Sequence, residues 1–117
     1  MKAIYIVHPY AGDGSVTPEE NRRKIDEIVR RMALKNDNIA ILSPTHMYSF
    51  LSVRDEHENR IALKQCLGVV RMADEVHVFG DYRTSWGCMM EIRCAQEAGK
   101  TIRYEDGTVE GGAYRGS

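Results

Sequence analysis

The chain has 117 residues, a mass of 13.3 kDa and a formal net charge of −1, because 16 basic residues are balanced by 17 acidic ones. This length predicts one domain built around one hydrophobic core. A hydrophobic fraction of 43% and a charged fraction of 28% are ordinary for a globular protein. The balanced charge argues against a general DNA-binding or RNA-binding protein, which needs a basic surface.

Cysteine usage and the N-terminal segment predict a cytoplasmic protein. The three cysteines are an odd number without the C-x-x-C spacing of a zinc or redox motif, which favours a reduced, intracellular compartment. The apolar run near the N-terminus is too short for a signal peptide, and no stretch has the roughly 20 apolar residues of a membrane-spanning helix. No pair of histidines has metal-ligand spacing, so the sequence indicates neither a metal nor a cofactor.

The chain opens with a strand pattern followed by a helix pattern. Residues 2–7 are β-branched and aromatic without alternation, which is typical of a strand buried on both faces. After a glycine-containing loop, Thr17, Pro18 and Glu20 predict a helix start with a capping box. This helix is expected to end near residues 36–38. Its predicted buried stripe consists of Ile25, Ile28, Val29, Met32 and Ala33.

The same alternation continues to the end of the chain. Residues 45–58 have a mixed character that is typical of a long functional loop with a helical turn. Residues 105–117 contain four glycines and no periodicity, so a flexible C-terminal tail is expected there. The other expected elements are a strand over 39–42, a helix over about 55–73, a strand over 75–80, a loop over 81–84, a helix capped by Ser85 that ends at Ala98 and Gly99, and a strand over 101–104.

Alternating strands and helices predict an α/β protein with a three-layer, Rossmann-like or flavodoxin-like arrangement. We expect a single domain over residues 1–104 with an open parallel sheet of four strands in the order 2-1-3-4 and three main helices. In such sheets ligands bind beyond the carboxyl ends of the strands, where the strand order reverses. That point lies between the first and third strands, so residues 8–14 and 81–87 are expected to face each other there.

Glu91 is the leading candidate for a catalytic residue. It lies six positions after Ser85 in the third expected helix, among small and apolar neighbours, so a solvated helix face explains it poorly. The free N–H groups of the helix start, together with the small side chains of Ser85 and Gly87, leave room for a ligand. The alternative is a surface glutamate that forms an ion pair with Arg93 or Lys100.

The loops at the expected ligand edge supply further candidates. Backbone N–H groups of residues 8–14 are able to bind a phosphate or a sugar, although the G-x-G-x-x-G spacing is lacking and a plain surface loop remains the alternative. Cys88 is the cysteine nearest this edge and the candidate for a reactive thiol. The candidate substrate-binding residues are His8, Tyr10, Gly12, His46, Asp81, Ser85 and Gly87.

Three ordered segments carry a resemblance to a known family. They are Ile4–Tyr10 (IYIVHPY), Ala73–Asp81 (ADEVHVFGD) and the block from Ser85 to Lys100, which has the pattern S-x-G-x-x-x-E-I-x-x-A-x-x-x-G-K. With these segments the chain resembles the nucleoside 2-deoxyribosyltransferase-like superfamily, in particular its short bacterial and phage members. The resemblance extends to about Tyr104, and the last block is its most specific part.

The resemblance implies chemistry at an N-glycosidic bond. Members of this superfamily exchange bases on deoxynucleosides or hydrolyse deoxynucleoside monophosphates, and a glutamate attacks the anomeric carbon. By position, Glu91 matches this nucleophile, Tyr5 matches a tyrosine beside it, and Ser85 matches a serine that contacts the 5′ end of the substrate. The resemblance also implies a nucleoside or nucleotide as the small-molecule partner, and a homodimer or higher homo-oligomer, for which residues 44–58 offer apolar surface.

One position departs from the superfamily pattern. Active members carry an aspartate eight residues before the aspartate of the Ala-Asp pair, and counting back from Asp74 leads to Cys66. A thiol does not replace a carboxylate as an acid or as a hydrogen-bond acceptor. Either Asp55, His46 or Asp81 takes over this role, or the protein binds a nucleotide or an ADP-ribose-type ligand without cleaving it. The sequence thus predicts an N-glycosidic-bond enzyme, with non-catalytic binding as the alternative.

Overall fold

The computed structural model describes residues 1–11 and 16–112, which form one five-stranded sheet in the order β2-β1-β3-β4-β5. The first four strands in this order are parallel, and β5 is antiparallel to β4. The elements are β1 (Lys2–Val7), α1 (Pro18–Lys35), β2 (Ile39–Leu42), α2 (Pro44–Met47), α3 (Glu56–Met72), β3 (Glu75–Val78), the 3-10 turn η1 (Tyr82–Thr84), α4 (Trp86–Glu97), β4 (Thr101–Tyr104) and β5 (Val109–Glu110). The predicted α/β class and the order 2-1-3-4 of the parallel strands are confirmed.

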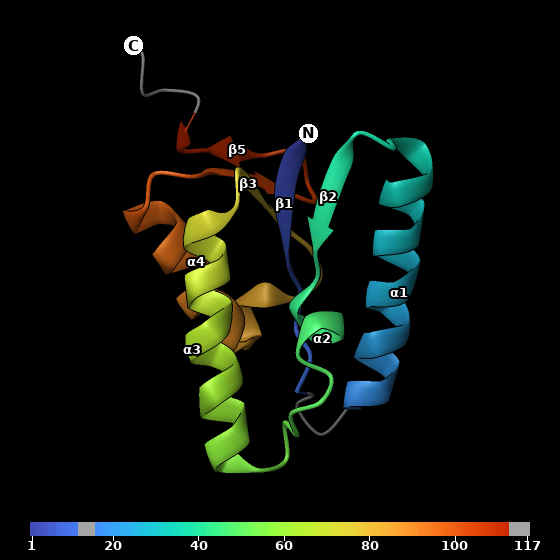
Figure 1. The fold of residues 1–117 in the computed structure, drawn as a ribbon, viewed down its shortest axis with the longest axis vertical. Helices are drawn as coiled ribbons and strands as arrows, with labels where there is room; N and C mark the ends of the chain where they lie inside the picture. The colour runs from blue at the N-terminus through green and yellow to red at the C-terminus, as the bar shows by residue number, and fades with distance from the viewer. Residues whose placement is uncertain (12–15, 113–117) are drawn as a thin grey trace.

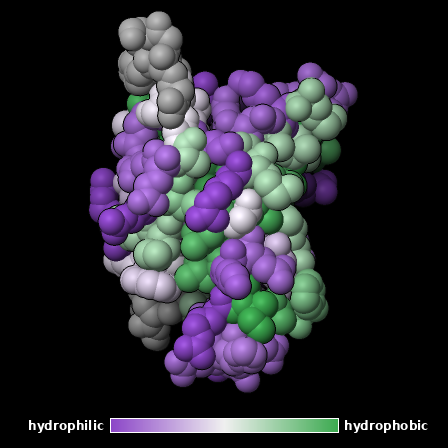
Figure 2. All heavy atoms as spheres, turned by 60° about the vertical axis from the view of Figure 1, so that its left-hand side comes forward, coloured by the Kyte–Doolittle hydropathy of each residue, from purple (hydrophilic) through white to green (hydrophobic). Residues whose placement is uncertain are grey.

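Helices cover both faces of the sheet. Figure 1 shows α1 on one side, and α3 and α4 on the other. Because neighbouring side chains along a strand point to opposite faces, β1 contributes to both layers. Tyr5 and Val7 belong to the buried cluster with α3 and α4, whereas Ile4 and Ile6 are buried on the face toward α1. The face that carries α3 and α4 has hydrophobic side chains along its middle, bordered by polar ones (Figure 2).

Local capping signals set the helix ends. The Thr17 hydroxyl accepts a hydrogen bond from the Glu20 N–H at 3.1 Å, and the Ser85 hydroxyl accepts one from the Cys88 N–H at 3.2 Å, as expected for N-caps. Gly99 has a φ of +70° directly after the last residues of α4, which favours glycine at this position. The structure therefore confirms the predicted helix starts at Thr17 and Ser85 and the predicted helix end at Gly99.

The buried stripe of α1 is narrower than predicted. Ile25 and Ile28 are buried and Val29 and Met32 are half-buried, but Ala33 is exposed. The contacts of α1 with the sheet are made mainly to β2, an edge strand, so only a narrow stripe of the helix is covered.

The sheet has one strand more than the sequence predicts. Part of the expected tail, residues 105–112, instead folds back, and β5 pairs with Arg103 and Ile102 of β4. Gly111 and Gly112 are needed because a Cβ at these positions would lie 2.3 Å from the Lys100 carbonyl oxygen and 1.9 Å from the Thr101 hydroxyl oxygen. The glycines thus allow a close approach of two backbone segments. Residues 113–117 lie outside the described residues.

The segment between β2 and α3 contains the one-turn helix α2, in agreement with the predicted helical turn. The third strand ends at Val78, two residues earlier than expected, because Gly80 has a φ of +70° and turns the chain away. Within residues 1–11 and 16–112, none of the helices is both long and apolar enough to span a bilayer.

Candidate functional site

A buried tyrosine–glutamate pair joins α4 to β1. Tyr5 is fully buried, and Glu91 has a relative exposure of 8%. The Tyr5 hydroxyl donates a hydrogen bond to Oε2 of Glu91. The alternative of a surface glutamate paired with Arg93 or Lys100 is wrong, because Glu91 is buried, and Arg93 lies 3.9 Å from Glu97 instead. Glu91 is therefore an internal carboxylic acid with one named partner.

Burial controls the proton affinity of this pair. Desolvation raises the pKa of Glu91 from 4.5 to about 7, although the hydrogen bond from Tyr5 acts in the opposite direction. Desolvation and the nearby carboxylate also raise the pKa of Tyr5 well above its usual value, so its phenol keeps its proton. Burial thus favours the protonated acid form of Glu91 more than in an exposed glutamate, and the hydrogen bond from Tyr5 favours the carboxylate. A buried carboxyl group with a perturbed pKa is typical of functional sites.

Cys66 lies against this pair. It belongs to the same buried cluster as Tyr5, and its thiol interacts with both Tyr5 and Glu91. Burial, followed by the charge of Glu91, raises the pKa of the Cys66 thiol to about 11. The thiol is therefore neutral at physiological pH, and it occupies the position where the superfamily pattern has an aspartate.

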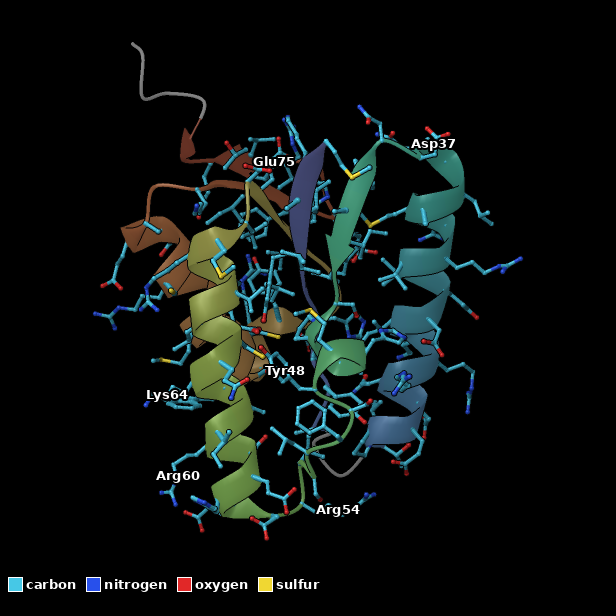
Figure 3. All side chains as sticks on the ribbon, in the orientation of Figure 1. Asp37, Tyr48, Arg54, Arg60, Lys64 and Glu75 are labelled. Atoms are coloured by element: carbon cyan, nitrogen blue, oxygen red, sulfur yellow. The ribbon has the colours of Figure 1, made fainter. Side chains whose placement is uncertain are left out.

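Tyr48, which follows α2, belongs to the segment predicted to offer apolar surface for self-association and was not among the candidate site residues. Its ring is half-buried against the cluster that contains Tyr5 and Cys66, and it lies near Phe50, with a distance of 6.1 Å between the ring centroids. Burial and the nearby Cys66 raise the pKa of the Tyr48 hydroxyl. Figure 3 shows Tyr48 between α2 and α3, far from Glu75 at the opposite end of the sheet. The neighbouring aromatic and apolar residues are the only sequence signal that points to it.

The N-terminus of α4 brings three further candidates together. The Ser85 hydroxyl oxygen caps the helix, and its proton remains able to act as a donor. Gly87 is half-buried, and a Cβ there would come no closer than 4.0 Å to the Ser85 hydroxyl oxygen, so the space beside it is open. Cys88 has a relative exposure of 2%, and burial raises the pKa of its thiol to about 12. The hypothesis of a reactive Cys88 is therefore wrong, because its thiolate is strongly disfavoured.

The loops after β1 and β3 meet, as the strand order predicts. His8 is half-buried, and its Nε2 would lie 3.0 Å from a Cβ at Gly80. The Tyr10 carbonyl accepts a hydrogen bond of 3.2 Å from the buried side chain of Asn21 on α1, which fixes the first part of this loop. Gly12 lies outside the described residues.

Three further candidates are His46, Asp55 and Asp81, and the first two make hydrogen bonds elsewhere in the structure. His46 is 2.5 Å from Asp26 through Nε2 and 2.7 Å from the Ser43 hydroxyl through Nδ1, so both ring nitrogens connect it to neighbouring polar groups. Asp55 caps α3 by accepting the Glu58 N–H at 2.9 Å. Asp81 is exposed at the start of η1 and makes no side-chain cap there. The structure connects none of these three side chains to Glu91 through a described contact.

A second polar cluster lies at the amino edge of the sheet. Glu75 is buried and contacts Lys2 at 2.6 Å, His77 at 3.0 Å and Arg103 at 3.0 Å. Burial opposes its ionisation, but these three donors prevail and lower its pKa to about 2. A cavity of about 590 Å³ at the same edge is lined by Met1, Lys2, Asn36, Asn38, Ile39 and Asp74. Neither feature touches the pair of Tyr5 and Glu91.

Comparisons with known proteins agree with this fold. The structure of a 2-deoxyribosyltransferase from the psychrotolerant bacterium Bacillus psychrosaccharolyticus is similar, with a TM-score of 0.59 and 16% sequence identity over 87% of this chain and 70% of that one. At this identity the likeness concerns the fold alone. None of the curated proteins matches the sequence. Residues 2–105 match the family described as a domain of unknown function, DUF7768. Since this match includes nearly the whole chain, the protein belongs to the DUF7768 family.

Proposed function

We propose that the protein acts on the N-glycosidic bond of a nucleoside or nucleotide, with Glu91 as the nucleophile. The observation that carries the proposal is the buried pair of Tyr5 and Glu91 beside the point where the strand order reverses. The fold shared with a 2-deoxyribosyltransferase and the S-x-G-x-x-x-E block support the same function. Membership of the nucleoside 2-deoxyribosyltransferase-like superfamily is part of this proposal.

The proposed first step is attack by a Glu91 carboxylate oxygen on C1′ of the sugar. The C1′–N bond breaks, its electron pair leaves with the base, and the base takes a proton from water. The anomeric carbon passes through an oxocarbenium-like state, which an adjacent carboxylate stabilises and then traps as an ester. Water or an incoming base then releases the sugar and regenerates the carboxylate, which gives hydrolysis or base transfer.

Tyr5 positions the nucleophile in this scheme. Its hydroxyl donates to Oε2 of Glu91, which leaves the second oxygen of the carboxylate for the attack. The hydrogen bond from Tyr5 also lowers the pKa of Glu91, against the larger effect of burial, and so favours the carboxylate that is needed for the attack.

The proposed ligand lies over the carboxyl ends of β1 and β3. Ser85 and the N-terminus of α4 suit the 5′ end of the ligand because a hydroxyl and free N–H groups donate to phosphate or hydroxyl oxygens. His8, Tyr10, Gly12, Gly87 and Asp81 complete the proposed contacts. His46 remains a proposed contact only if its ring leaves Asp26 when the ligand binds. With three free thiols, we place the protein in the cytoplasm, and we propose that it forms a homo-oligomer.

Cys66 favours a second candidate function. A neutral thiol beside Tyr5 and Glu91 supplies no carboxylic acid for the leaving base. On this alternative the protein binds a nucleotide or an ADP-ribose-type ligand without cleaving it, as a sensor or a sequestering protein.

One experiment separates the two functions. The full chain is incubated with a panel of nucleosides, deoxynucleotides and ADP-ribose, and mass spectrometry measures free base while thermal shift measures binding. Release of base from at least one compound is the outcome expected for the enzyme. Stabilisation by a nucleotide without any product supports the binding function, and neither binding nor product contradicts both.

A further inference from the structure

Three buried side chains from three different elements form one hydrogen-bonded group. Tyr5 of β1 donates a hydrogen bond to Glu91 of α4, and the thiol of Cys66 on α3 has a hydrogen-bond contact with the Tyr5 hydroxyl. The relative exposures are 0% for Tyr5, 7% for Cys66 and 8% for Glu91. Because these side chains are largely shielded from water, their polar atoms depend on one another for hydrogen bonds.

The positions of the protons set the direction of each hydrogen bond in this group. The Tyr5 hydroxyl has one proton, and it donates this proton to Oε2 of Glu91, because a carboxylate only accepts. The Tyr5 oxygen is therefore left to act as an acceptor toward Cys66. Burial and the charge of Glu91 raise the pKa of the Cys66 thiol to about 11, so the thiol keeps its proton and is the donor. Donation thus runs from Cys66 to Tyr5 and from Tyr5 to Glu91.

A donor on the α3 side of Tyr5 affects the bond on its α4 side in two ways. A hydroxyl proton rotates to suit its surroundings, and a second proton that approaches the Tyr5 oxygen from Cys66 repels it from that side. The Tyr5 proton is therefore directed toward Glu91. Chains of hydrogen bonds also polarise one another, which strengthens each bond by roughly 10–30%.

We propose that Cys66 is a positioning residue for Glu91 and that it acts through Tyr5. Its S–H group donates to the Tyr5 oxygen and thereby directs the Tyr5 proton to Oε2 of Glu91. The catalytic consequence rests on the proposed function, in which Glu91 is the nucleophile, whereas the order of donation does not. Position 66 thus needs a neutral hydrogen-bond donor for this role.

The neighbouring titratable groups leave this order of donation undisturbed. Within residues 1–11 and 16–112, the other titratable groups with a described interaction in the trio are Cys88, next to Glu91, and Tyr48, next to Cys66. Burial raises the pKa of the Cys88 thiol to about 12 and also raises the pKa of the Tyr48 hydroxyl, so both groups are uncharged at neutral pH. Neither therefore competes as a charged acceptor for the protons of Cys66 and Tyr5.

Infrared spectroscopy of the S–H stretching band tests the order of donation, because the frequency of this band falls when a thiol donates a hydrogen bond. The Cys66 band is the one that is absent from Cys66→Ala. Cys94→Ala is the matched control, since Cys94 is a buried thiol of the same cluster that donates to the Leu67 carbonyl at 3.6 Å. We expect Tyr5→Phe to raise the frequency of the Cys66 band and to leave the Cys94 band unchanged. A Cys66 band at the same frequency in wild type and Tyr5→Phe overturns the inference.

The pKa of Glu91 tests the effect on the nucleophile. NMR of the chain with ¹³C-labelled glutamate measures this pKa, and Glu91→Gln assigns the signal. We expect Cys66→Ala to raise the pKa of Glu91 by a few tenths of a pH unit, because a weaker hydrogen bond from Tyr5 favours the carboxylate less. Cys66→Ser, which keeps a donor, and Cys94→Ala should both remain close to the wild type. Equal values in wild type and Cys66→Ala overturn the positioning role.

Turnover separates this role from the proposed function. We expect the pH–rate profile of Cys66→Ala to shift to higher pH by as much as the pKa of Glu91, and Cys66→Ser to restore the wild-type profile. The same loss of turnover in Cys66→Ala and Cys94→Ala, without a shift of the profile, assigns Cys66 to packing and overturns the positioning role. A wild-type chain that releases no base from any compound overturns the proposed function and the catalytic consequence with it, while the infrared band still decides the order of donation.

Discussion

The hydroxyl group of Tyr5 in β1 donates a hydrogen bond to Oε2 of Glu91 in α4, across residues that are 86 positions apart in the chain. Both side chains are buried in the core, yet one of them is a carboxylic acid with a pKa of about 7. Burying such a group costs stability unless it is well partnered. The arrangement is understandable if Glu91 is kept for its chemistry, and it leads to the following predictions.

Tyr5→Phe should weaken the nucleophile by removing its hydrogen-bond donor. The hydrogen bond from Tyr5 lowers the pKa of Glu91, so its loss raises this pKa further and reduces the carboxylate fraction at neutral pH. A hydrogen bond to a charged group contributes about 1.5–3 kcal/mol, so turnover at pH 7 should fall roughly 10-fold to 100-fold and recover in part at pH 9. A pH–rate profile measures this shift. Tyr104→Phe is the control, because the Tyr104 hydroxyl also donates a hydrogen bond to a glutamate, Glu110, at 3.0 Å. Equal pH–rate profiles for Tyr5→Phe and Tyr104→Phe would contradict the prediction.

Glu91→Gln should stabilise the protein above neutral pH. The pKa of Glu91 is higher in the folded chain, about 7, than its ordinary value of 4.5, so the folded state holds this proton more tightly. The free energy of unfolding therefore decreases as the pH rises from about 4.5 through 7, and a glutamine avoids this loss. At pH 8 the variant should gain up to about 3 kcal/mol, with little difference from the wild type below pH 4.5. Urea unfolding at both pH values checks this. Glu97 is exposed, so the control variant Glu97→Gln should show no such pH dependence. A gain in the free energy of unfolding at pH 8 as large as that of Glu91→Gln would contradict the prediction.

Glu75→Gln should have the opposite effect. The pKa of Glu75 is lowered to about 2, so its ionised form stabilises the folded chain above about pH 4.5, and this contribution is lost as the pH falls toward 2. Replacing it leaves Lys2, His77 and Arg103 without their shared carboxylate. Because Lys2 and Arg103 are partly exposed, we expect a loss of about 1–3 kcal/mol at pH 7, measured by urea unfolding. A loss that is unchanged at pH 2 would show that packing, rather than charge, is responsible.

Self-association should depend on the segment between β2 and α3. Phe50 has a relative exposure of 73% and Met47 one of 38%, although both are large hydrophobic residues. Light scattering coupled to size-exclusion chromatography is expected to give a dimer or a larger oligomer for the wild type, and Phe50→Ser should shift the equilibrium toward the monomer. Met72→Ser, a change at a site with 78% exposure on α3, serves as the control. A monomeric wild type would exclude the prediction.

The strands and helix ends could be predicted because their signals are local. Strands 2–7, 39–42 and 101–104 have the predicted bounds, and the caps at Thr17 and Ser85 act within one helical turn. The strand β5 could not be predicted in this way. It has two residues, and its pairing depends on glycines that only make sense beside Lys100 and Thr101.

The candidate site was predictable in part for the same reason. Glu91 stands out locally because its neighbours are apolar, and the structure gives it a buried partner. His46 was assigned to the ligand edge from its place after β2, but its contact with Asp26 is made across 20 positions of the chain. The approach of Tyr48 to Cys66 likewise brings α3 and the segment after α2 together, and a tertiary contact of this kind leaves no pattern in either segment.

Base release by Glu91 variants tests the central claim most directly. The compound from the nucleoside and nucleotide panel that yields the most free base is incubated with wild type, Glu91→Ala, Glu91→Gln and the exposed control Glu97→Gln, and free base is measured by mass spectrometry. We predict that both Glu91 variants lose base release while they still bind the compound, and that Glu97→Gln keeps the wild-type rate. Unchanged base release by Glu91→Ala would contradict the assignment of Glu91 as the nucleophile.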